Sequence, residues 1–397
     1  MKILILTIGT RGDIQVYIGL SQKLINAGHS VTIASSRAHE KLITSFGIQY
    51  ECIDEAVDTG LINNVIEKKG LKAVKEGIRL LFDGMYLSHT RVMELIPDND
   101  LVIGHGWLGE TESDMCNKRF IRVGISPNLA EKVKSKATTI RQKLMINIES
   151  YAINQLIIKP YNEFRQKIKA PVTSLAEINR KSLFIPISKV LIDSMSLWND
   201  NTYQSSYWYT DFNGYTLPQE LDNMLNNGKK NILINFGSMT GWIHNGNELA
   251  DIFNEVAEKK NLNVLFIGKN IIDTKKIHSE SLFQIDEIPL SSILHRFDAC
   301  FHHCGLGTTS EILRSGCPSI PVPFIIDQFD WAKRLIKTGS ATEILNYKDI
   351  TLKNIINRLD VIFNDQRYKT NAFKVRETVN NEIIEDRTVN NIERLCN

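Results

Sequence analysis

The stretch from residue 297 to 333 constrains the fold of this 397-residue chain more than any other. A short apolar run at 299–301 leads into the sequence HHCGLGTT, and a helical pattern follows from 309 to 315. The glycines therefore stand where a strand turns into a helix. Glycine lets the backbone approach a ligand closely, and the free N–H groups and the dipole at a helix start favour an anion. This pattern predicts an α/β domain with an anion-binding turn.

A second strand-like run, residues 319–324, leads to Asp327 and Gln328. A carboxylate and an amide at the end of a strand can hold neutral hydroxyl groups through several hydrogen bonds. An anion site at one end and hydroxyl-binding groups at the other describe a sugar attached to phosphate.

The first 35 residues repeat the alternation of strand, glycine loop and helix. Residues 2–8 form a continuous apolar run, as expected of a buried parallel strand. A helical stretch ends before Gly28, and residues 29–35 form the next strand, which is the opening βαβ unit of a doubly wound domain. The loop between them lacks the GxGxxG spacing of dinucleotide-binding enzymes, which argues against a nicotinamide cofactor.

Asp13 lies just beyond the carboxyl end of the first predicted strand, where ligands of such sheets bind. The alternative is that its carboxylate only caps the following helix.

The length of the chain indicates two domains, because 397 residues are too many for one ordinary core. Further strands are predicted at 101–106, 120–125, 185–190, 207–209, 231–236 and 263–267, and residues 52–96 are rich in helical spacing. The polar, turn-rich stretch 213–228 is the predicted linker between a first domain, 1–212, and a second, 229–374.

Composition excludes several classes of protein. Lys and Arg number 47 and Asp and Glu 45, so the net charge of +2 gives no argument for nucleic acid. We interpret the N-terminal MKILILTIGT as a first strand and not as a signal peptide, because it has no small-residue cleavage site. The sequence contains no run of 18 apolar residues, so we expect no transmembrane helix. The six cysteines show no disulfide framework, which favours a reducing, cytoplasmic location.

A zinc site was weighed at Cys300, His302, His303, Cys304 and Cys317. Cys300 lies inside an apolar run and no cysteine pair has the short CxxC spacing, so we expect no metal.

Residues 131–169 differ from the rest of the chain in charge, with nine basic and three acidic residues, a net charge of +6. Apolar residues are interleaved with the basic ones. We favour a solvated helix with a buried face. The alternative is a basic amphipathic helix in peripheral contact with the anionic inner face of a membrane.

The sequence HHCGLGTT…RSGCPSIPVPFIIDQFDWA resembles the donor-binding motif of nucleotide-sugar glycosyltransferases with the GT-B fold, in the UDP-glycosyltransferase superfamily. The closest pattern is that of sterol glucosyltransferases and bacterial antibiotic glycosyltransferases, HHGGxGTT…RAGxPxxxxPxxxDQxxWA, in which glycine stands at the position of Cys304. The opening GTRGDIQVYIGL is similar to the GxRGDxxPyxAL pattern of the same family, with Val16 in place of proline.

The resemblance implies a GT-B architecture of two doubly wound, Rossmann-like domains facing across a cleft. The first domain would bind the acceptor and the second the nucleotide sugar. A C-terminal helix, about 375–397, would pack back on the first domain.

The resemblance also implies an inverting glycosyltransferase. It would move a hexose, glucose by the pattern, from a UDP or dTDP sugar to a hydroxyl of a lipophilic acceptor such as a sterol, polyketide or macrolide. Asp13 would be the catalytic base and His303 would face the diphosphate, with His302 on the opposite face of the strand. No metal cofactor is implied. The implied donor-binding residues are Thr10, Arg11, Gly12, Ser238, Ile288, Leu290, His303, Gly305, Leu306, Gly307, Thr308, Asp327 and Gln328.

Two other functions stay open. One is a nucleotide-sugar epimerase or phosphorylase of the same fold. The other is a non-catalytic protein that binds nucleotide sugars.

Overall fold

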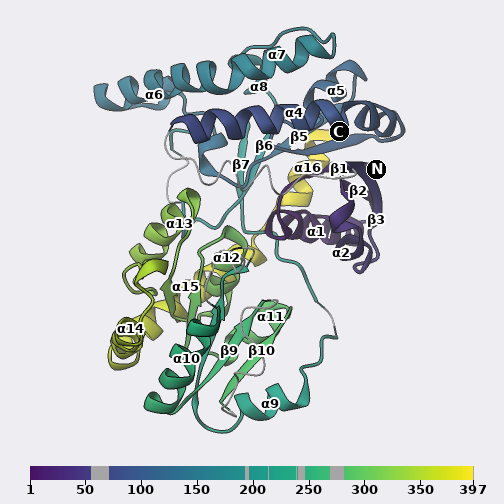
Figure 1. The fold of residues 1–397 in the computed structure, drawn as a ribbon. Helices are drawn as coiled ribbons and strands as arrows, with labels where there is room; N and C mark the ends of the chain where they lie inside the picture. The colour runs from purple at the N-terminus through teal and green to yellow at the C-terminus, as the bar shows by residue number, and fades with distance from the viewer. Residues whose placement is uncertain are drawn as a thin grey trace. The chain divides into compact units, whose positions relative to one another are not determined.

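The computed structural model describes residues 1–54, 71–192, 196–212, 214–237, 239, 246–268 and 281–396. The chain divides into two compact units (Figure 1). Unit 1 comprises residues 1–189, 193–210 and 386–397, and unit 2 comprises residues 190–192 and 211–385.

Unit 1 is built on a parallel sheet whose strands lie in the order β3-β2-β1-β4-β5-β6-β7. The strands are β1 (Lys2–Leu6), β2 (Ser30–Ser36), β3 (Gln49–Asp54), β4 (Leu101–His105), β5 (Arg119–Val123), β6 (Leu183–Pro186) and β7 (Thr202–Ser205). The helices are α1 (Arg11–Asn26), α2 (Glu40–Thr44), α4 (Leu71–Leu95), α5 (Glu110–Met115), α6 (Ile140–Ile153), α7 (Lys159–Lys167), α8 (Leu175–Ile178) and α16 (Thr388–Cys396). The sequence predicted β1, β2, β4 and β5 from their apolar runs.

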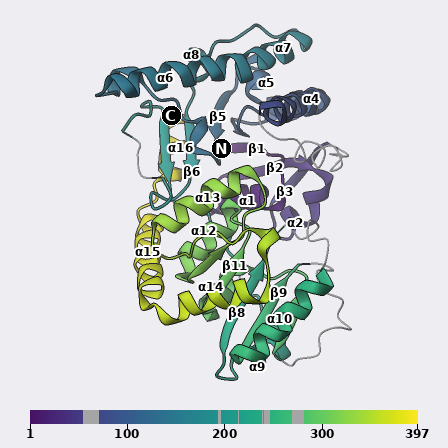
Figure 2. The ribbon, with the colours of Figure 1, turned by 60° about the vertical axis from the view of Figure 1, so that its left-hand side comes forward.

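Aromatic side chains join α4 and α7 to the sheet of unit 1. The ring of Tyr161 lies 5.4 Å from that of Phe82, 5.9 Å from that of Trp107 and 6.0 Å from that of Phe164. A π-helical turn, Asn154–Ile158, connects α6 to α7 in one continuous rod, as Figures 1 and 2 show.

Unit 2 has a parallel sheet in the order β10-β9-β8-β11-β12. Its strands are β8 (Lys230–Asn235), β9 (Leu262–Ile267), β10 (Leu282–Ile285), β11 (Ala299–His302) and β12 (Ser319–Pro321). Its helices are α9 (Gln219–Leu225), α10 (Gly246–Lys260), α11 (Leu290–Ile293), α12 (Leu306–Ser315), α13 (Ile326–Lys337), α14 (Leu352–Asn364) and α15 (Gln366–Ile384).

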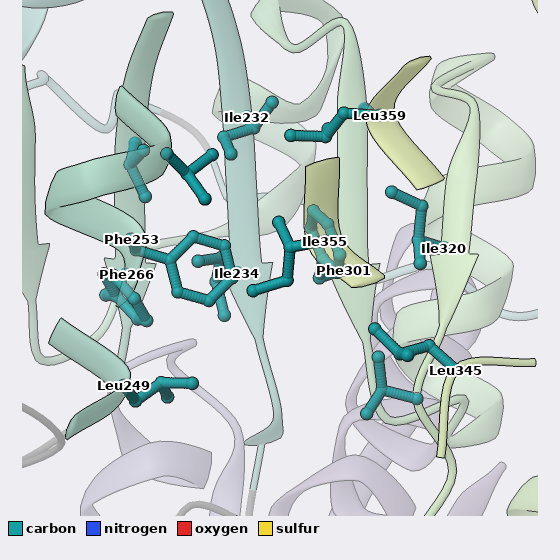
Figure 3. Close-up of a cluster of buried hydrophobic side chains, with 14 of the residues drawn as sticks. Ile232, Ile234, Leu249, Phe253, Phe266, Phe301, Ile320, Leu345, Ile355 and Leu359 are labelled. Atoms are coloured by element: carbon teal, nitrogen blue, oxygen red, sulfur yellow. The ribbon is translucent and has the colours of Figure 1, made fainter. Parts of the chain in front are cut away.

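The core of unit 2 follows from the alternation of side chains along its strands. Ile232 and Ile234 of β8 point to one face of the sheet, where Phe253 of α10 and Ile355 of α14 cover them (Figure 3). Leu233, between them, points to the other face and belongs to a second cluster. Both faces are apolar because helices cover both, as in other parallel sheets.

Both sheets have the same topology. In chain order each begins with a central strand, adds two strands on one side and then continues on the other side, so the order reverses between β1 and β4 and again between β8 and β11. Ligands of doubly wound sheets bind beyond the carboxyl ends of the strands at this reversal.

Two predictions from the sequence are wrong in detail. Residues 207–209 are not a strand, because the ladder is made earlier by β7. In addition, α6 does not have the expected buried apolar face, since Leu144, Met145 and Ile148 are exposed.

The predicted linker and the predicted C-terminal helix both differ from the helices that the structure has there. Within the predicted linker 213–228 lies α9, whose Leu221 and Leu225 are buried in unit 2. Of the predicted C-terminal helix 375–397, the part up to Ile384 belongs to α15 of unit 2, and α16 belongs to unit 1. Among the residues described above, no helix is both long enough and apolar enough to span a bilayer.

A buried hydrogen bond attaches α16 to the rest of unit 1. Trp208 Nε1, which is fully buried, donates to Thr388 Oγ1 at 3.0 Å, and this hydroxyl donates to Asp386 Oδ1 at 2.7 Å. The Asp386 carboxylate also pairs with Lys23 Nζ of α1 at 3.0 Å. The hydroxyl of Thr388 therefore links the indole to a buried carboxylate.

Replacing this hydroxyl tests the attachment. We expect Thr388→Val to lower the free energy of unfolding by about 1–3 kcal/mol, because it leaves a buried indole N–H without an acceptor. Thr388→Ser keeps the hydroxyl and is the matched control, with a much smaller expected loss. Urea unfolding followed by tryptophan fluorescence measures both. Equal losses in the two variants would show that the methyl group matters and the hydrogen bond does not.

Candidate functional site

In unit 2 the predicted donor site lies at the reversal of strand order. The peptide N–H of His303, just after β11, donates to the carbonyl of Asn235 at the end of β8 at 3.3 Å. The side-chain Oδ1 of Asn235 accepts from Gly237 N at 3.0 Å. One buried asparagine thus holds both loops that border the site. Sequence analysis missed Asn235, although its polar side chain at the end of an apolar strand was a usable signal.

His303 is 8% exposed and sits between two glycines. A Cβ at Gly237 would lie 2.7 Å from Cε1 of the His303 ring, and a Cβ at Gly305 would lie 3.2 Å from its Cδ2. Any larger residue at either position would displace the ring. The His303 ring is also 3.5 Å from the Asn235 carbonyl through Nδ1, a long contact. Burial lowers the pKa of His303 to about 4, against a weak opposing effect of this carbonyl.

His302, the last residue of β11, has a different environment. It is fully buried, and its Nδ1 accepts from the peptide N–H of Cys304 at 3.3 Å. Burial, and then the neighbouring His303, lower its pKa to about 3. Both rings are therefore neutral at pH 7, and His302 serves the backbone of the turn.

Helix α12 starts directly after this turn with Gly305 as its N-cap. Its first intrahelical hydrogen bond runs from Thr309 N to Gly305 O at 2.9 Å, so the amides of Leu306, Gly307 and Thr308 precede it. These three residues are partly exposed. They are the first three of the ten residues of α12, and the N–H groups and dipole of such a terminus favour an anion.

The expected sugar-binding pair lies in the first turn of α13 and not at the end of a strand, because β12 ends at Pro321. Asp327 is exposed. Gln328 is 3% exposed, and its Oε1 accepts from the peptide N–H of Phe324 at 2.8 Å and of Ile325 at 3.3 Å. The amide oxygen of Gln328 thus holds its own loop, which leaves Nε2 as its group for a ligand.

Of the remaining predicted donor residues, Ile288 is buried in the core of unit 2 and Leu290, at the start of α11, is partly buried against it. Ile288 could therefore meet a ligand only through its backbone. Ser238 lies outside the described residues.

Thr10, Arg11, Gly12 and Asp13 lie together in unit 1, at the start of α1. The Asp13 Oδ2 atom accepts from Thr10 N at 2.6 Å and from Thr10 Oγ1 at 2.9 Å. The N-cap of α1 is Thr10, so Asp13 is not the cap considered from sequence; it stands at the third helical position and completes a capping box through one of its two carboxylate oxygens.

The charge of Asp13 affects the pKa of two neighbouring side chains, His105 and Tyr17. Burial lowers the pKa of His105, and the Asp13 carboxylate opposes this effect. Burial raises the pKa of the Tyr17 phenol, and Asp13 raises it further. The His105 ring lies 5.6 Å from the Tyr17 ring, and its Nδ1 donates to the Ile8 carbonyl at 3.1 Å. The other ring nitrogen of neutral His105 then carries a lone pair, so His105 is a second candidate base.

The structure thus places Thr10 to Asp13 at the strand reversal of unit 1, and His303 to Thr308 at that of unit 2. In the described parts of the chain, no three or more His, Cys, Asp or Glu side chains converge as a metal site would require.

Comparison with known proteins agrees with this division. Residues 3–86 match the glycosyltransferase family 28 N-terminal domain, and residues 264–395 match the erythromycin biosynthesis protein CIII-like C-terminal domain. The first match lies in unit 1, and most of the second lies in unit 2.

Similar solved structures show that the fold is GT-B. The glycosyltransferase SnogD from Streptomyces nogalater has a TM-score of 0.73 at 16% identity, and the two chains cover each other completely. The glycosyltransferase VinC, in complex with dTDP, has a TM-score of 0.72 at 16% identity over 96% of this chain and 95% of VinC.

Relatives are also found by sequence. A sterol 3-beta-glucosyltransferase of Vanderwaltozyma polyspora is 24% identical over 95% of this chain, and one of Arabidopsis thaliana is 24% identical over 96%. The chain spans 33% of the length of the yeast protein and 63% of that of the plant protein.

The GT-B motif also explains the backbone at Cys304. This residue has a φ of +63°, in the left-handed region, where the related pattern has glycine. Its side chain is fully buried, with Sγ 3.6 Å from the carbonyl of His302. A residue with a Cβ costs about 1–2 kcal/mol in this conformation, so Cys304 occupies a position better suited to glycine.

Two substitutions at Cys304 separate the backbone from the thiol. Both Cys304→Gly and Cys304→Ala remove the sulfur, but only glycine relieves the left-handed backbone. We expect Cys304→Gly to be more stable than Cys304→Ala, with a free energy of unfolding that is roughly 1 kcal/mol higher. Denaturant unfolding of the two variants side by side makes the comparison. If the alanine variant were equally stable, the turn would carry no such strain.

Proposed function

We propose that this chain is an inverting glycosyltransferase that moves a hexose from a nucleoside diphosphate sugar to a hydroxyl group of a lipophilic small molecule. The observation that carries the proposal is the anion site formed by the start of α12 beside His303, in a chain whose two domains match glycosyltransferase families. The sterol 3-beta-glucosyltransferase relatives support glucose as the sugar and a sterol-like acceptor.

The reaction is a single displacement. The acceptor oxygen attacks the anomeric carbon, the bond from that carbon to the diphosphate oxygen breaks with its electron pair, and the acceptor proton moves to a base. The amides of Leu306 to Thr308 would stabilise the charge that develops on the departing diphosphate.

His303 would contribute differently from a permanent cation. Its pKa of about 4 makes the unliganded ring neutral at pH 7. A bound diphosphate beside the ring favours the protonated form. We therefore propose that His303 acts on the leaving group as a hydrogen-bond donor whose proton affinity rises when the donor substrate binds.

Asp13 is the proposed base. The peptide N–H and the hydroxyl of Thr10 both donate to Oδ2 of its carboxylate, so we assign proton transfer to Oδ1. Fixing one oxygen orients the other without occupying it. His105, whose second nitrogen carries a lone pair, is the alternative base.

Replacing the carboxylate separates catalysis from capping. Asparagine keeps a side-chain oxygen that can accept from the peptide N–H and the hydroxyl of Thr10, so Asp13→Asn should fold normally and bind the donor as before. Its kcat should fall by about 10²–10⁴-fold, the usual contribution of a positioned base. Turnover and donor binding are measured on the same preparation.

Thr10→Ala is the matched control for this experiment, because it removes the hydroxyl bond to Oδ2 and keeps the carboxylate. We expect it to retain most of the turnover. Near-normal turnover of Asp13→Asn would remove Asp13 from the mechanism, and His105→Gln would then be examined.

Gln328 gives a second test, because its two amide atoms have different partners. Gln328→Glu keeps an oxygen for the peptide N–H groups of Phe324 and Ile325 but loses the N–H donors of Nε2. If Nε2 holds a sugar hydroxyl, this variant should weaken sugar-nucleotide binding about tenfold, which corresponds to one good hydrogen bond, while leaving affinity for the free nucleoside diphosphate unchanged. Titration calorimetry with both ligands measures the difference.

Gln328→Ala removes both functions of the amide and should also lower the melting temperature. Equal loss of affinity for sugar nucleotide and free nucleotide in Gln328→Glu would contradict the sugar-binding role.

Ligand binding can identify the nucleotide of the donor, and product analysis can separate glycosyl transfer from the competing functions. Thermal-shift measurements with UDP-glucose and dTDP-glucose compare uridine with thymidine. Incubation without acceptor separates transfer from the alternatives, since an epimer or a sugar phosphate among the products would favour the epimerase or phosphorylase.

A further inference from the structure

Helix α6 turns apolar side chains towards solvent along its whole length. Ile140, Leu144, Met145, Ile148 and Tyr151 are between 57% and 86% exposed. The buried side chain of α6 is Ile146. A surface helix of a globular protein ordinarily shows the reverse arrangement, with its apolar stripe on the core.

These exposed residues form one stripe. Ile140, Leu144, Ile148 and Tyr151 are spaced by four, four and three residues, which places them on one face of the helix. At about 100° per residue, Ile146 falls on the opposite side. The face that carries Ile146 therefore packs on unit 1, while the opposite face, which carries the stripe, is apolar and exposed. Contiguous exposed apolar surface of this kind marks an interaction site.

Basic side chains accompany the stripe. Arg141 and Lys143 of α6 are exposed, and so is Lys134 in the turn before the helix. On the same helix Glu149 is already paired with Lys132 at 2.8 Å. Elsewhere in segment 131–169, Lys136 and Lys167 pair with Asp200 and Asp83 and Arg165 is buried, so the cations that border the stripe are those of Lys134, Arg141 and Lys143. An apolar stripe bordered by Lys and Arg is the pattern of a helix that lies in the interface of an anionic bilayer.

The stripe is too small for a stable contact with a second copy of the chain. Its five large side chains come from a single helix, whereas a stable protein interface takes about 20–30 residues from each partner. Such a helix can instead enter a lipid surface, where Tyr151 has an amphipathic ring suited to the boundary between headgroups and acyl chains.

We propose that the outward face of α6 docks the protein on an anionic membrane surface. Leu144 and Ile148 enter the acyl boundary and Arg141 and Lys143 pair with lipid headgroups. The surface is a property of unit 1 and does not depend on the proposed activity. It also deepens that activity, because an enzyme held at a bilayer meets lipophilic acceptors where they are concentrated.

The test is sedimentation of the full-length protein with vesicles of phosphatidylcholine alone or with added phosphatidylserine. At low salt we expect binding to the anionic vesicles, release by high salt, and little binding to the neutral ones, because surface attraction is screened. Leu144→Glu/Ile148→Glu should reduce binding to anionic vesicles by at least about tenfold. Leu87→Glu is the matched control, since Leu87 is 81% exposed on α4, and it should bind as wild type does.

Two results of the vesicle experiment would contradict membrane docking through α6. Absence of binding to anionic vesicles at low salt, or equal loss in the Leu87→Glu control, would overturn it. Light scattering examines the alternative occupant, because a wild-type dimer that Leu144→Glu/Ile148→Glu converts to monomer would assign the face to a second copy. Turnover with a water-soluble acceptor should be the same in this variant and in wild type. Lack of transferase activity in both would remove the proposed function and leave the vesicle result unaffected.

Discussion

The carbonyl group of Asn235 is the point on which the candidate donor site depends. It accepts the peptide N–H of His303, while the Asn235 side chain accepts the peptide N–H of Gly237. A strand that ends in an apolar residue could offer the carbonyl but not the second bond. The two loops on either side of the strand reversal are therefore held by one residue, and the buried His303 ring fits between glycines that this attachment brings to it.

A related contact is found in unit 1. There His105, the last residue of β4, donates from its ring Nδ1 to the carbonyl of Ile8 in the loop that follows β1. In unit 2 the bond comes instead from the peptide N–H of His303, just after β11, and ends on Asn235, the last residue of β8. The two sites differ in the helix that borders them: α1, after the first strand of unit 1, begins with Thr10 and Asp13, and α12, after the fourth strand of unit 2, begins with glycines. One helix start presents a carboxylate and the other presents bare amides, which suits a proton acceptor and an anion site respectively.

The sequence predicted those parts of the structure that depend on local patterns. Continuous apolar runs such as 2–8 and 231–236 are strands because a parallel sheet covered by helices is apolar on both faces. The assignment of His303 to the ligand side stays a prediction, while His302 is fully buried and accepts from the peptide N–H of Cys304. Sequence patterns could not show that Oε1 of Gln328 accepts from the peptide N–H of Phe324, which leaves Nε2 for a ligand. That contact depends on how the loop before α13 folds in three dimensions. Spacing likewise left two readings of α6 open, and the buried face that we favoured is wrong, since spacing shows that a stripe exists but not which way it points.

The π-helical turn Asn154–Ile158 accounts for the direction of that stripe. A turn of this kind contains one residue more than an α-helical turn, so it rotates all that precedes it by about 100° relative to all that follows. After the turn, α7 buries Tyr161 and Phe164 against the sheet; before it, α6 presents its apolar residues to solvent. Pro160, which lacks an N–H and crowds the carbonyl four residues earlier, follows directly. Loss or gain of a single residue here would turn α6 by about 100° relative to α7 and so change which of its side chains face solvent, without altering any side chain on it. In a lineage of such proteins, attachment to a surface could thus arise or vanish through one codon.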